Sequence, residues 1–335
     1  MGMSRVRDAS DGEPPPRVLV VGPNLAIDRT MSTNTFRPGH EVDVAEVAVT
    51  AGGKGVNVAR ALRALGFGAT LLGLRPGRMG DAVDGLLADE GVALLGVPVP
   101  GELRSAFIIH ERDGRATVLN EPGPELAEED WLAYEARAEA ALDEHSIVVC
   151  VGSLPPGAPD DAYARIVAKA RERGCPSVVD ASGSVLLRAL DEQPDIVCPN
   201  LAEAEAVLLG ATSEAVDAPE EAHARSVAAA RSLVDGGART AIVTAAAAGA
   251  AIAEAGRRQV RWVSAPAVTV ANPMGAGDAF AAGLAVALAR ELPPGEAARF
   301  AVAVASASVE HPRAGDLDAS RVEALMGSLR AEHAV

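Results

Sequence analysis

Residues 147–198 read IVVCVGSLPPGAPDDAYARIVAKARERGCPSVVDASGSVLLRALDEQPDIVC, and short apolar runs alternate there with longer amphipathic segments. The short runs are rich in valine and isoleucine, which predicts buried strands, and the longer segments have helical periodicity. The same alternation continues downstream. The predicted strands are 147–151, 177–180, 195–198 and 240–244, and the predicted helices are 160–173, 184–190 and 201–209. Strands separated by helices predict a mainly parallel sheet with helices on both faces, which is an α/β fold.

The predicted fold extends in both directions from this stretch. Residues 1–16 are polar and end in three prolines, so we expect a disordered leader, and no signal-peptide pattern is present in it. Order should begin with a buried strand at 17–22 and continue as one domain over 17–330. Residues 277–290 are apolar on nearly every side, which predicts a helix buried against several neighbours.

Two segments do not follow the strand–helix alternation. Residues 31–49 contain the partly alternating run EVDVAEVAV, and residues 104–120 contain two apolar runs separated by Asp113-Gly114. Asp-Gly between apolar runs is a hairpin signal. We therefore expect these segments to form a small β-sheet lid outside the parallel sheet.

Composition excludes several classes of protein. The chain has 335 residues and a net charge of −16, which disfavours broad binding to nucleic acids or anionic membranes. It has no apolar run of the roughly 18 residues that a membrane helix needs, which argues against a membrane-spanning protein. Because residues 1–16 lack the apolar stretch of a signal peptide, we expect a cytoplasmic protein. Three scattered cysteines give neither a disulfide framework nor a zinc site.

Two glycine-rich segments are the candidate functional sites. The segment 50–60 reads TAGGKGVNVAR, and it contains Lys54, one of only two lysines in the chain. The segment 272–280 reads NPMGAGDAF, and its glycines would expose backbone N–H groups to an anion at the start of a helix. Asp278 would lie next to this bound anion, which is an unfavourable place for a carboxylate unless the residue has a function. Accepting a proton from a hydroxyl group is such a function. Glycine-rich turns and first-turn aspartates are also common without any function.

These segments resemble the two signature motifs of the PfkB (ribokinase-like) carbohydrate kinase family. The Walker motif and the dinucleotide-binding fingerprint are both absent. Further elements resemble the family and its hexose-phosphate branch, which includes 1-phosphofructokinase and tagatose-6-phosphate kinase. These elements are NLAID at 24–28, NEPGP at 120–124, GSLPPG at 152–157, DASG at 180–183 and PNLAE at 199–203.

The resemblance implies a three-layer α/β/α sandwich with a β lid, which phosphorylates a ketohexose phosphate with ATP and Mg²⁺. It implies that Asp278 is the base and that the N–H groups of Gly275, Ala276 and Gly277 form the anion hole. The implied acceptor-binding residues are Asn24, Asp28, Gly52, Gly53, Lys54, Asn57 and Arg104, with Lys54 and Arg104 at the substrate phosphate. The implied nucleotide-binding residues are Asn200, Glu203, Thr244, Gly249, Gly275 and Gly277, and Asn200 and Glu203 would organise Mg²⁺ through water. By analogy, the lid could pair two subunits in a homodimer.

The sequence departs from the family pattern at three places. Cys198 and Ala246 stand where relatives often have lysine and glycine, and Leu103-Arg104 replaces a Thr-Arg element. We interpret Cys198 as a small buried residue at a strand end. Two alternatives therefore stay open: a kinase of a neutral sugar or nucleoside, and a homologue that binds ligands without catalysis.

Overall fold

A computed structural model describes residues 16–210, 218–329 and 331–333. Its main sheet has ten strands, and seven of them are parallel neighbours. In spatial order the parallel strands are β5 (Ala93–Val99), β4 (Gly68–Pro76), β1 (Arg17–Val21), β8 (Ile147–Val151), β9 (Ser177–Asp180), β10 (Ile196–Val197) and β11 (Thr240–Thr244). The sheet continues with the antiparallel strands β12 (Gly249–Glu254), β13 (Arg261–Ser264) and β14 (Ala331–His333).

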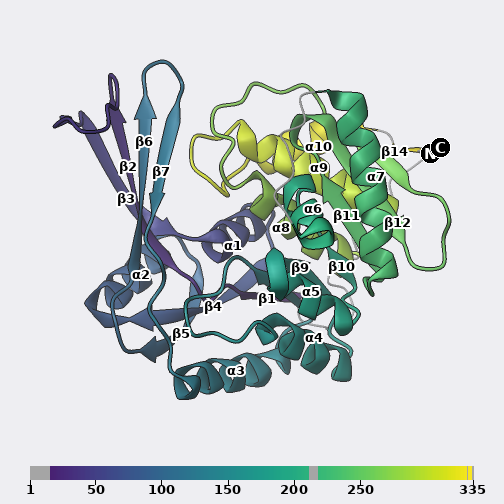
Figure 1. The fold of residues 1–335 in the computed structure, drawn as a ribbon, viewed down its shortest axis with the longest axis horizontal. Helices are drawn as coiled ribbons and strands as arrows, with labels where there is room; N and C mark the ends of the chain where they lie inside the picture. Colours follow the sequence, from purple (N-terminus) through teal and green to yellow (C-terminus); the bar gives the residue numbers. More distant parts are fainter. Residues whose placement is uncertain (1–15, 211–217, 330, 334–335) are drawn as a thin grey trace.

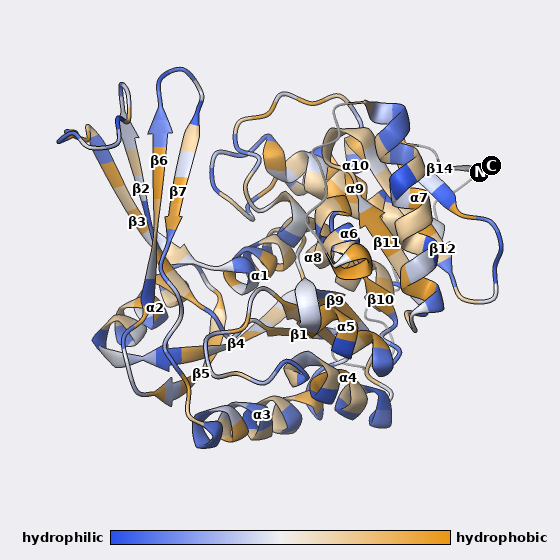
Figure 2. Ribbon diagram, viewed as in Figure 1, coloured by the Kyte–Doolittle hydropathy of each residue, from blue (hydrophilic) through white to orange (hydrophobic). Residues whose placement is uncertain are grey.

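Helices cover both faces of this sheet, so the α/β/α sandwich that the sequence predicts is confirmed. One face packs against α1 (Lys54–Ala64), α2 (Gly77–Asp89), α8 (Ala276–Ala289), α9 (Pro294–Val309) and α10 (Ala319–Met326). The other packs against α3 (Glu128–Leu142), α4 (Ala162–Glu172), α5 (Gly183–Asp191), α6 (Leu201–Leu209) and α7 (Pro219–Asp235). A short 3₁₀ turn, Ala246–Ala248, joins β11 to β12. Figure 2 shows hydrophobic strands at the centre and polar residues on the outward helix faces.

Four strands form a second sheet, which projects from one end of the main sheet and is called the lid here (Figure 1). Its order is β3 (Glu46–Gly52), β2 (Ala26–Thr33), β6 (Arg104–Glu111) and β7 (Ala116–Asn120). β6 and β7 are antiparallel and pair Phe107 with Leu119. β2 lies parallel to β6 although almost eighty residues separate them.

Three predicted strands have different bounds in the structure, and the first, predicted at 17–22, ends one residue earlier as β1. The strand expected at 195–198 is reduced to Ile196–Val197. In the segment 31–49, β3 begins only at Glu46, because its partner β2 ends at Thr33 and the ladder stops at the pair Ser32–Glu46. The N–H of Ala45 still donates to the carbonyl oxygen of Ser32 at 2.9 Å, but the β2–β3 ladder does not continue over residues 41–44.

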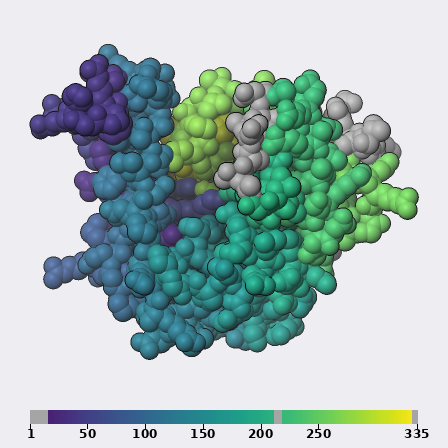
Figure 3. Space-filling model, viewed as in Figure 1, coloured from purple at the N-terminus to yellow at the C-terminus, as the bar shows by residue number. Residues whose placement is uncertain are grey.

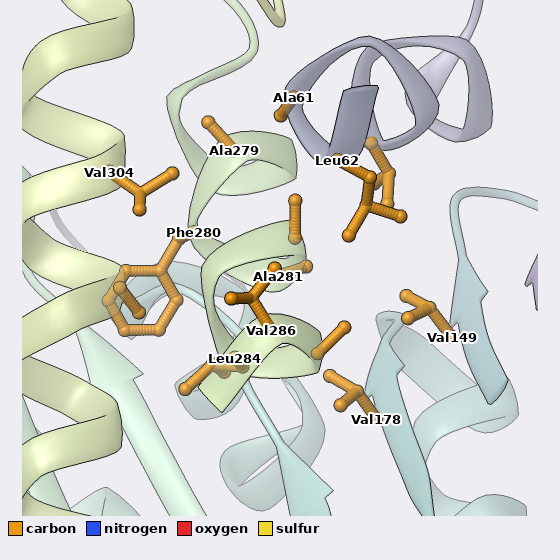
Figure 4. Packing of buried hydrophobic residues seen from close by; sticks show 14 of the residues in the cluster. Ala61, Leu62, Val149, Val178, Ala279, Phe280, Ala281, Leu284, Val286 and Val304 are labelled. Carbon is orange, nitrogen blue, oxygen red and sulfur yellow. The ribbon is translucent and has the colours of Figure 1, made fainter. Parts of the chain in front are cut away.

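The helix predicted at 277–290 is α8, and its burial on several sides is confirmed. Residues 278–287 are all buried, with α1, α9 and the strands β8 and β9 around them (Figure 4). At Gly283 a Cβ atom would lie 2.8 Å from the Cα of Ala301 on α9, which is too close. The absence of a side chain there lets the two helices approach each other.

The contact at Gly283 leads to a stability prediction. Alanine is favoured over glycine inside a helix by about 1 kcal/mol, but at position 283 it must push two backbones apart. We expect Gly283→Ala to lower the free energy of unfolding by about 1–3 kcal/mol in urea titrations. The matched control is Gly85→Ala in α2, where a Cβ atom meets nothing within 4 Å. It should leave stability unchanged or raise it, and equal effects of both changes would contradict the argument.

Candidate functional site

The candidate site lies at the carboxyl ends of the parallel strands, facing the lid. Strands β1, β8 and β9 end there at Val21, Val151 and Asp180, and α1 begins there at Lys54. Figure 3 shows the molecular surface hollowed between the lid and the rest of the molecule. The hollow includes a cavity of about 150 Å³, lined among others by Asn24, Lys54, Arg104, Ser153, Ser182 and Glu203. Ligands of open α/β sheets bind at this edge.

One cation and three carboxylates form the centre of the site. The Nζ of Lys54 lies 3.4 Å from Oδ2 of Asp180 and 3.7 Å from Oε1 of Glu203. Asp278, in the first turn of α8, is also close enough to act on this charge. Burial opposes the charged form of Lys54, but the three carboxylates outweigh burial and raise its pKa. The lysine therefore stays protonated, and the four groups carry a net charge of about −2 when all are ionised.

Asp278 is a carboxylate with a strongly raised pKa. Burial is the largest cause, and the nearby Asp180 adds to it, whereas Lys54 and a hydrogen bond from Asn57 oppose it. The result is a pKa of about 7. Nδ2 of Asn57 donates to Oδ2 of Asp278 at 2.7 Å. A carboxylate with this pKa can accept a proton near neutral pH and give it up again.

The N-terminus of α8 presents backbone donors next to this carboxylate. Gly275 is the N-cap residue with a φ of 80°, and Ala276 begins the helix. The first N–H groups of a helix have no acceptor within it, and the helix dipole adds positive potential, so an anion is stabilised there. Gly275, Ala276, Gly277 and Asp278 thus form the N-cap and first turn of α8, the helix start that the sequence predicts.

The expected acceptor-binding residues lie on the lid side of the site. Gly52 packs against Asp28 so closely that a Cβ atom would lie 1.9 Å from Oδ1 of that carboxylate. Burial raises the pKa of Asp28, and the positive charges of Arg60 and Arg104 oppose this. The Arg104 guanidinium donates to the carbonyl oxygen of Asn24 at 3.2 and 3.3 Å. Gly53 is the N-cap residue of α1, directly after Gly52.

The expected nucleotide residues outside α8 lie at the start of α6 and around the turn between β11 and β12. Asn200 caps α6: its Oδ1 accepts from the backbone N–H of Glu203, while Glu203 accepts from the N–H of Asn200. Thr244, at the end of β11, forms a bridge to Asn200, and Gly249 begins β12 after the 3₁₀ turn. Of these four residues, Glu203 lines the cavity. The capping geometry fixes the direction in which the Glu203 carboxylate points.

A divalent cation would find oxygen ligands here but not a complete protein cage. Among the described residues, no group of three or more His, Cys, Asp or Glu side chains is arranged to hold a metal ion. Magnesium commonly keeps several waters and uses one or two carboxylates with phosphate oxygens. The carboxylates of Asp180 and Glu203 fit that use.

Several residues of the site were not among the predicted site residues, and Asp180, Ser153 and Arg60 are the ones with polar contacts to predicted residues. Asp180 was noted only as part of the DASG element, yet it follows a buried parallel strand, a position that indicates a functional carboxylate. Ser153 lines the cavity and accepts from Nδ2 of Asn24 at 3.1 Å. Arg60 is almost fully buried behind Asn57, and nothing in its local sequence indicates this.

Cys198 and Ala246 occupy distinct environments. Cys198 is buried, and burial with the nearby Asp180 raises its pKa, so it remains a thiol. The interpretation as a small buried residue is confirmed. Ala246 has a φ of 46°, a left-handed conformation that favours glycine, in the turn between β11 and β12.

Residues 16–320 match the sequence model of the pfkB family carbohydrate kinases. A 1-phosphofructokinase of Rhodobacter capsulatus is 34% identical over 289 residues, which cover 86% of this chain and 88% of the relative. An ATP-dependent 6-phosphofructokinase isozyme 2 of Mycobacterium tuberculosis is 31% identical over 82% of this chain and 78% of the relative. The crystal structure of phosphofructokinase-2 from Escherichia coli in complex with potassium superimposes with a TM-score of 0.83 at 26% identity, covering 93% and 99% of the two chains. In the described part of this chain, no helix is long and apolar enough to span a bilayer.

The burial of Asp278 predicts a pH-dependent stability. Its pKa rises from about 3.8 in the unfolded chain to about 7 in the folded one, so the folded state loses stability as the pH rises through this range. Asparagine does not titrate, and Asp278→Asn should therefore be more stable than the original chain at high pH. A tenfold change in proton affinity corresponds to about 1.4 kcal/mol, so this advantage should be about 1–3 kcal/mol larger at pH 8 than at pH 5. Urea unfolding at both pH values measures it, and an equal difference at both would contradict the assignment.

Proposed function

Because this chain belongs to the pfkB family of carbohydrate kinases, we propose that it transfers the terminal phosphoryl group of ATP to a hydroxyl of a phosphorylated ketohexose. Fructose 1-phosphate, fructose 6-phosphate and tagatose 6-phosphate are the acceptors in this class. The observation that carries the proposal is the position of Arg104. It lines the cavity on the acceptor side, and both of its hydrogen bonds go to a neutral carbonyl oxygen. The carboxylates of Asp28 and Glu121 act on its charge electrostatically, but neither accepts a hydrogen bond from it among the described residues, so an anionic acceptor can bind to the guanidinium in a chain with a net charge of −16.

In the proposed reaction the acceptor hydroxyl lies between the lid residues and Asp278. Asp28 and Asn57 hold hydroxyl groups of the sugar, and Oδ1 of Asp278 takes the proton of the reacting hydroxyl. The oxygen of the acceptor hydroxyl then forms a bond to the terminal phosphorus of ATP. At the same time the bond between that phosphorus and the bridging oxygen breaks, which releases ADP. Positioned charge is most of what phosphoryl transfer requires.

The α8 N-terminus and Lys54 supply the positive potential for this transfer. The N–H groups of residues 275–278 face the transferring phosphoryl group, and Lys54 offsets charge that would otherwise accumulate among the carboxylates. Glu203 and Asp180, with Asn200 through water, would hold Mg²⁺, which neutralises phosphate charge when it is bound. The lid excludes water, which competes as an acceptor.

One observation favours a second candidate, a kinase of a neutral sugar or nucleoside. Lys54 was expected at the acceptor phosphate, but its Nζ lies beside Asp180 and Glu203. If Lys54 is committed to these carboxylates, Arg104 is left as the principal cation for an acceptor phosphate. The two candidates make opposite predictions for Arg104.

An acceptor panel decides between the candidates. The protein with ATP and Mg²⁺ is offered the three ketohexose phosphates, and separately fructose, ribose and adenosine. We expect a ketohexose phosphate to give the highest kcat/KM. Arg104→Ala should lower that value about tenfold to a hundredfold and leave neutral acceptors nearly unchanged, because a charged contact is worth about 1.5–3 kcal/mol.

Two further variants calibrate this assay. Arg115→Ala removes a cation from the same lid hairpin, where Arg115 pairs with Asp113 and Glu111 outside the cavity, and it should behave like the original chain. Asp278→Asn should lower turnover about 10²–10⁴-fold with every acceptor. If a neutral acceptor gives the highest kcat/KM and Arg104→Ala does not change that value, the second candidate is supported. If no acceptor consumes ATP, the proposal of a kinase is overturned.

We also propose that the outer face of the lid pairs with a second copy of the chain. The register places Val47, Val49 and Leu119 on the face opposite Asp28, and these side chains are 43–51% exposed. Exposed apolar side chains grouped on one sheet face are typical of an interface. Sedimentation equilibrium should give twice the chain mass, and Val49→Asp should give the monomer. Leu187→Asp on α5, also at an exposed leucine, is the control and should leave the dimer intact. A monomeric original chain would contradict this proposal.

A further inference from the structure

Arg60 is a buried cation behind the acceptor side of the site. Only 1% of the residue is exposed, and it lies in α1 one turn after Asn57. Its guanidinium makes two hydrogen bonds to the carboxylate of Glu90, at 2.5 Å from Nε and 2.8 Å from Nη2. A bidentate pair of this kind fixes the plane of the guanidinium. Burying such an ion pair costs desolvation free energy. The other contacts of Arg60 indicate what the buried pair does.

The remaining donors of Arg60 reach three parts of the chain around the site. Nη2 donates to the carbonyl oxygen of Ala51, directly before Gly52, at 2.6 Å. Nη1 donates to Oδ1 of Asn57 at 3.2 Å and to the carbonyl oxygen of Ala314 at 3.5 Å. The loop that contains Ala314 in turn packs against Gly275, the N-cap residue of α8. The Arg60 side chain therefore contacts the segment before Gly52, the Asn57 amide and the loop that packs against the N-terminus of α8.

The contact with Asn57 has a specific chemical consequence. A guanidinium has donors but no acceptor, so the atom of the Asn57 amide that faces it must be the oxygen. The amide nitrogen then faces the other way, and it donates to Oδ2 of Asp278 at 2.7 Å. With Oδ2 occupied, Oδ1 of Asp278 is the oxygen left for an acceptor hydroxyl. Without Arg60, the Asn57 oxygen loses this donor, and of these two hydrogen bonds only the one to Asp278 still holds the amide in place.

We propose that Arg60, clamped by Glu90, is a positioning residue that sets the orientation of the Asn57 amide and through it the orientation of Asp278. This inference rests on the proposed function, in which Asp278 takes the proton of the acceptor hydroxyl. Arg60 itself touches neither the acceptor nor ATP in this scheme. Small displacements of a reacting group cost catalysis as much as a hundredfold.

The test uses two variants of the clamp and a matched control, assayed with the best acceptor of the panel. Arg60→Lys keeps the charge but offers one compact head group, which cannot hold Glu90, Ala51 and Asn57 together. Glu90→Gln keeps the shape and leaves Arg60 in place, which guards against a folding defect. We expect kcat to fall about tenfold to a hundredfold in Arg60→Lys and less in Glu90→Gln.

Arg299→Lys on α9 is the matched control for the loss of a structural arginine. Arg299 also joins one carboxylate, that of Glu296, to two backbone carbonyl oxygens, those of Met326 and Leu329. None of these partners lines the cavity. Arg299→Lys should lower the unfolding temperature but keep kcat within about twofold. An equal loss of kcat in the control and in Arg60→Lys, both assayed well below their unfolding temperatures, would overturn the proposal.

A double-mutant cycle with Asn57→Ala shows whether Arg60 acts through Asn57. Residues that act through one another have non-additive effects. In the Asn57→Ala background we expect Arg60→Lys to cost less than about threefold in kcat, because the amide it orients is already absent. The same tenfold or larger loss in both backgrounds would overturn the inference while the proposed function stands. An original chain without turnover on any acceptor would instead overturn the proposed function, and this inference with it.

Discussion

The ion pairs of Lys54 with Asp180 and Glu203 are the interaction on which the site depends. They join the first turn of α1 to the end of β9 and the first turn of α6, which both lie more than 120 residues after Lys54 in the chain. Three carboxylates this close would repel each other without the cation, and burial would force protons onto more than one of them. Lys54 thus permits an acidic cluster beside the helix terminus that receives phosphate in the proposed reaction.

Much of the sheet was predictable because its signals are local. The runs at 147–151, 177–180 and 240–244 match the observed strands residue for residue, since each is a short segment that contains neighbouring β-branched residues. The bounds of β3 were not predictable, because they depend on where β2 stops. Lys54 was found as a candidate, but its partner Asp180 lies 126 positions away, and no local pattern connects them. Arg60 was missed because only the folded structure shows that its side chain is buried.

Two of the three departures from the family pattern, Cys198 and Ala246, have different physical consequences. At Cys198 the cluster already contains a cation, Lys54, so the thiol adds neither charge nor repulsion next to Asp180. At Ala246 a non-glycine residue adopts a left-handed conformation, which costs roughly 1–2 kcal/mol and is retained in the turn that joins β11 to β12. Cys198 is therefore accommodated by packing, whereas Ala246 is accompanied by local backbone strain.

The chain passes between body and lid close to Asn24, and this has a consequence for binding. Asn24 lies between β1 of the main sheet and β2 of the lid, and its carbonyl oxygen accepts from Arg104 at the start of β6. After β7 the chain returns to the body at Gly123, which packs against the Asn24 side chain. A molecule seated in the cavity touches this junction directly. A change in the angle of the lid that altered the contacts at Asn24 would also change the affinity of the cavity, and occupancy would then bias the lid by the same free energy.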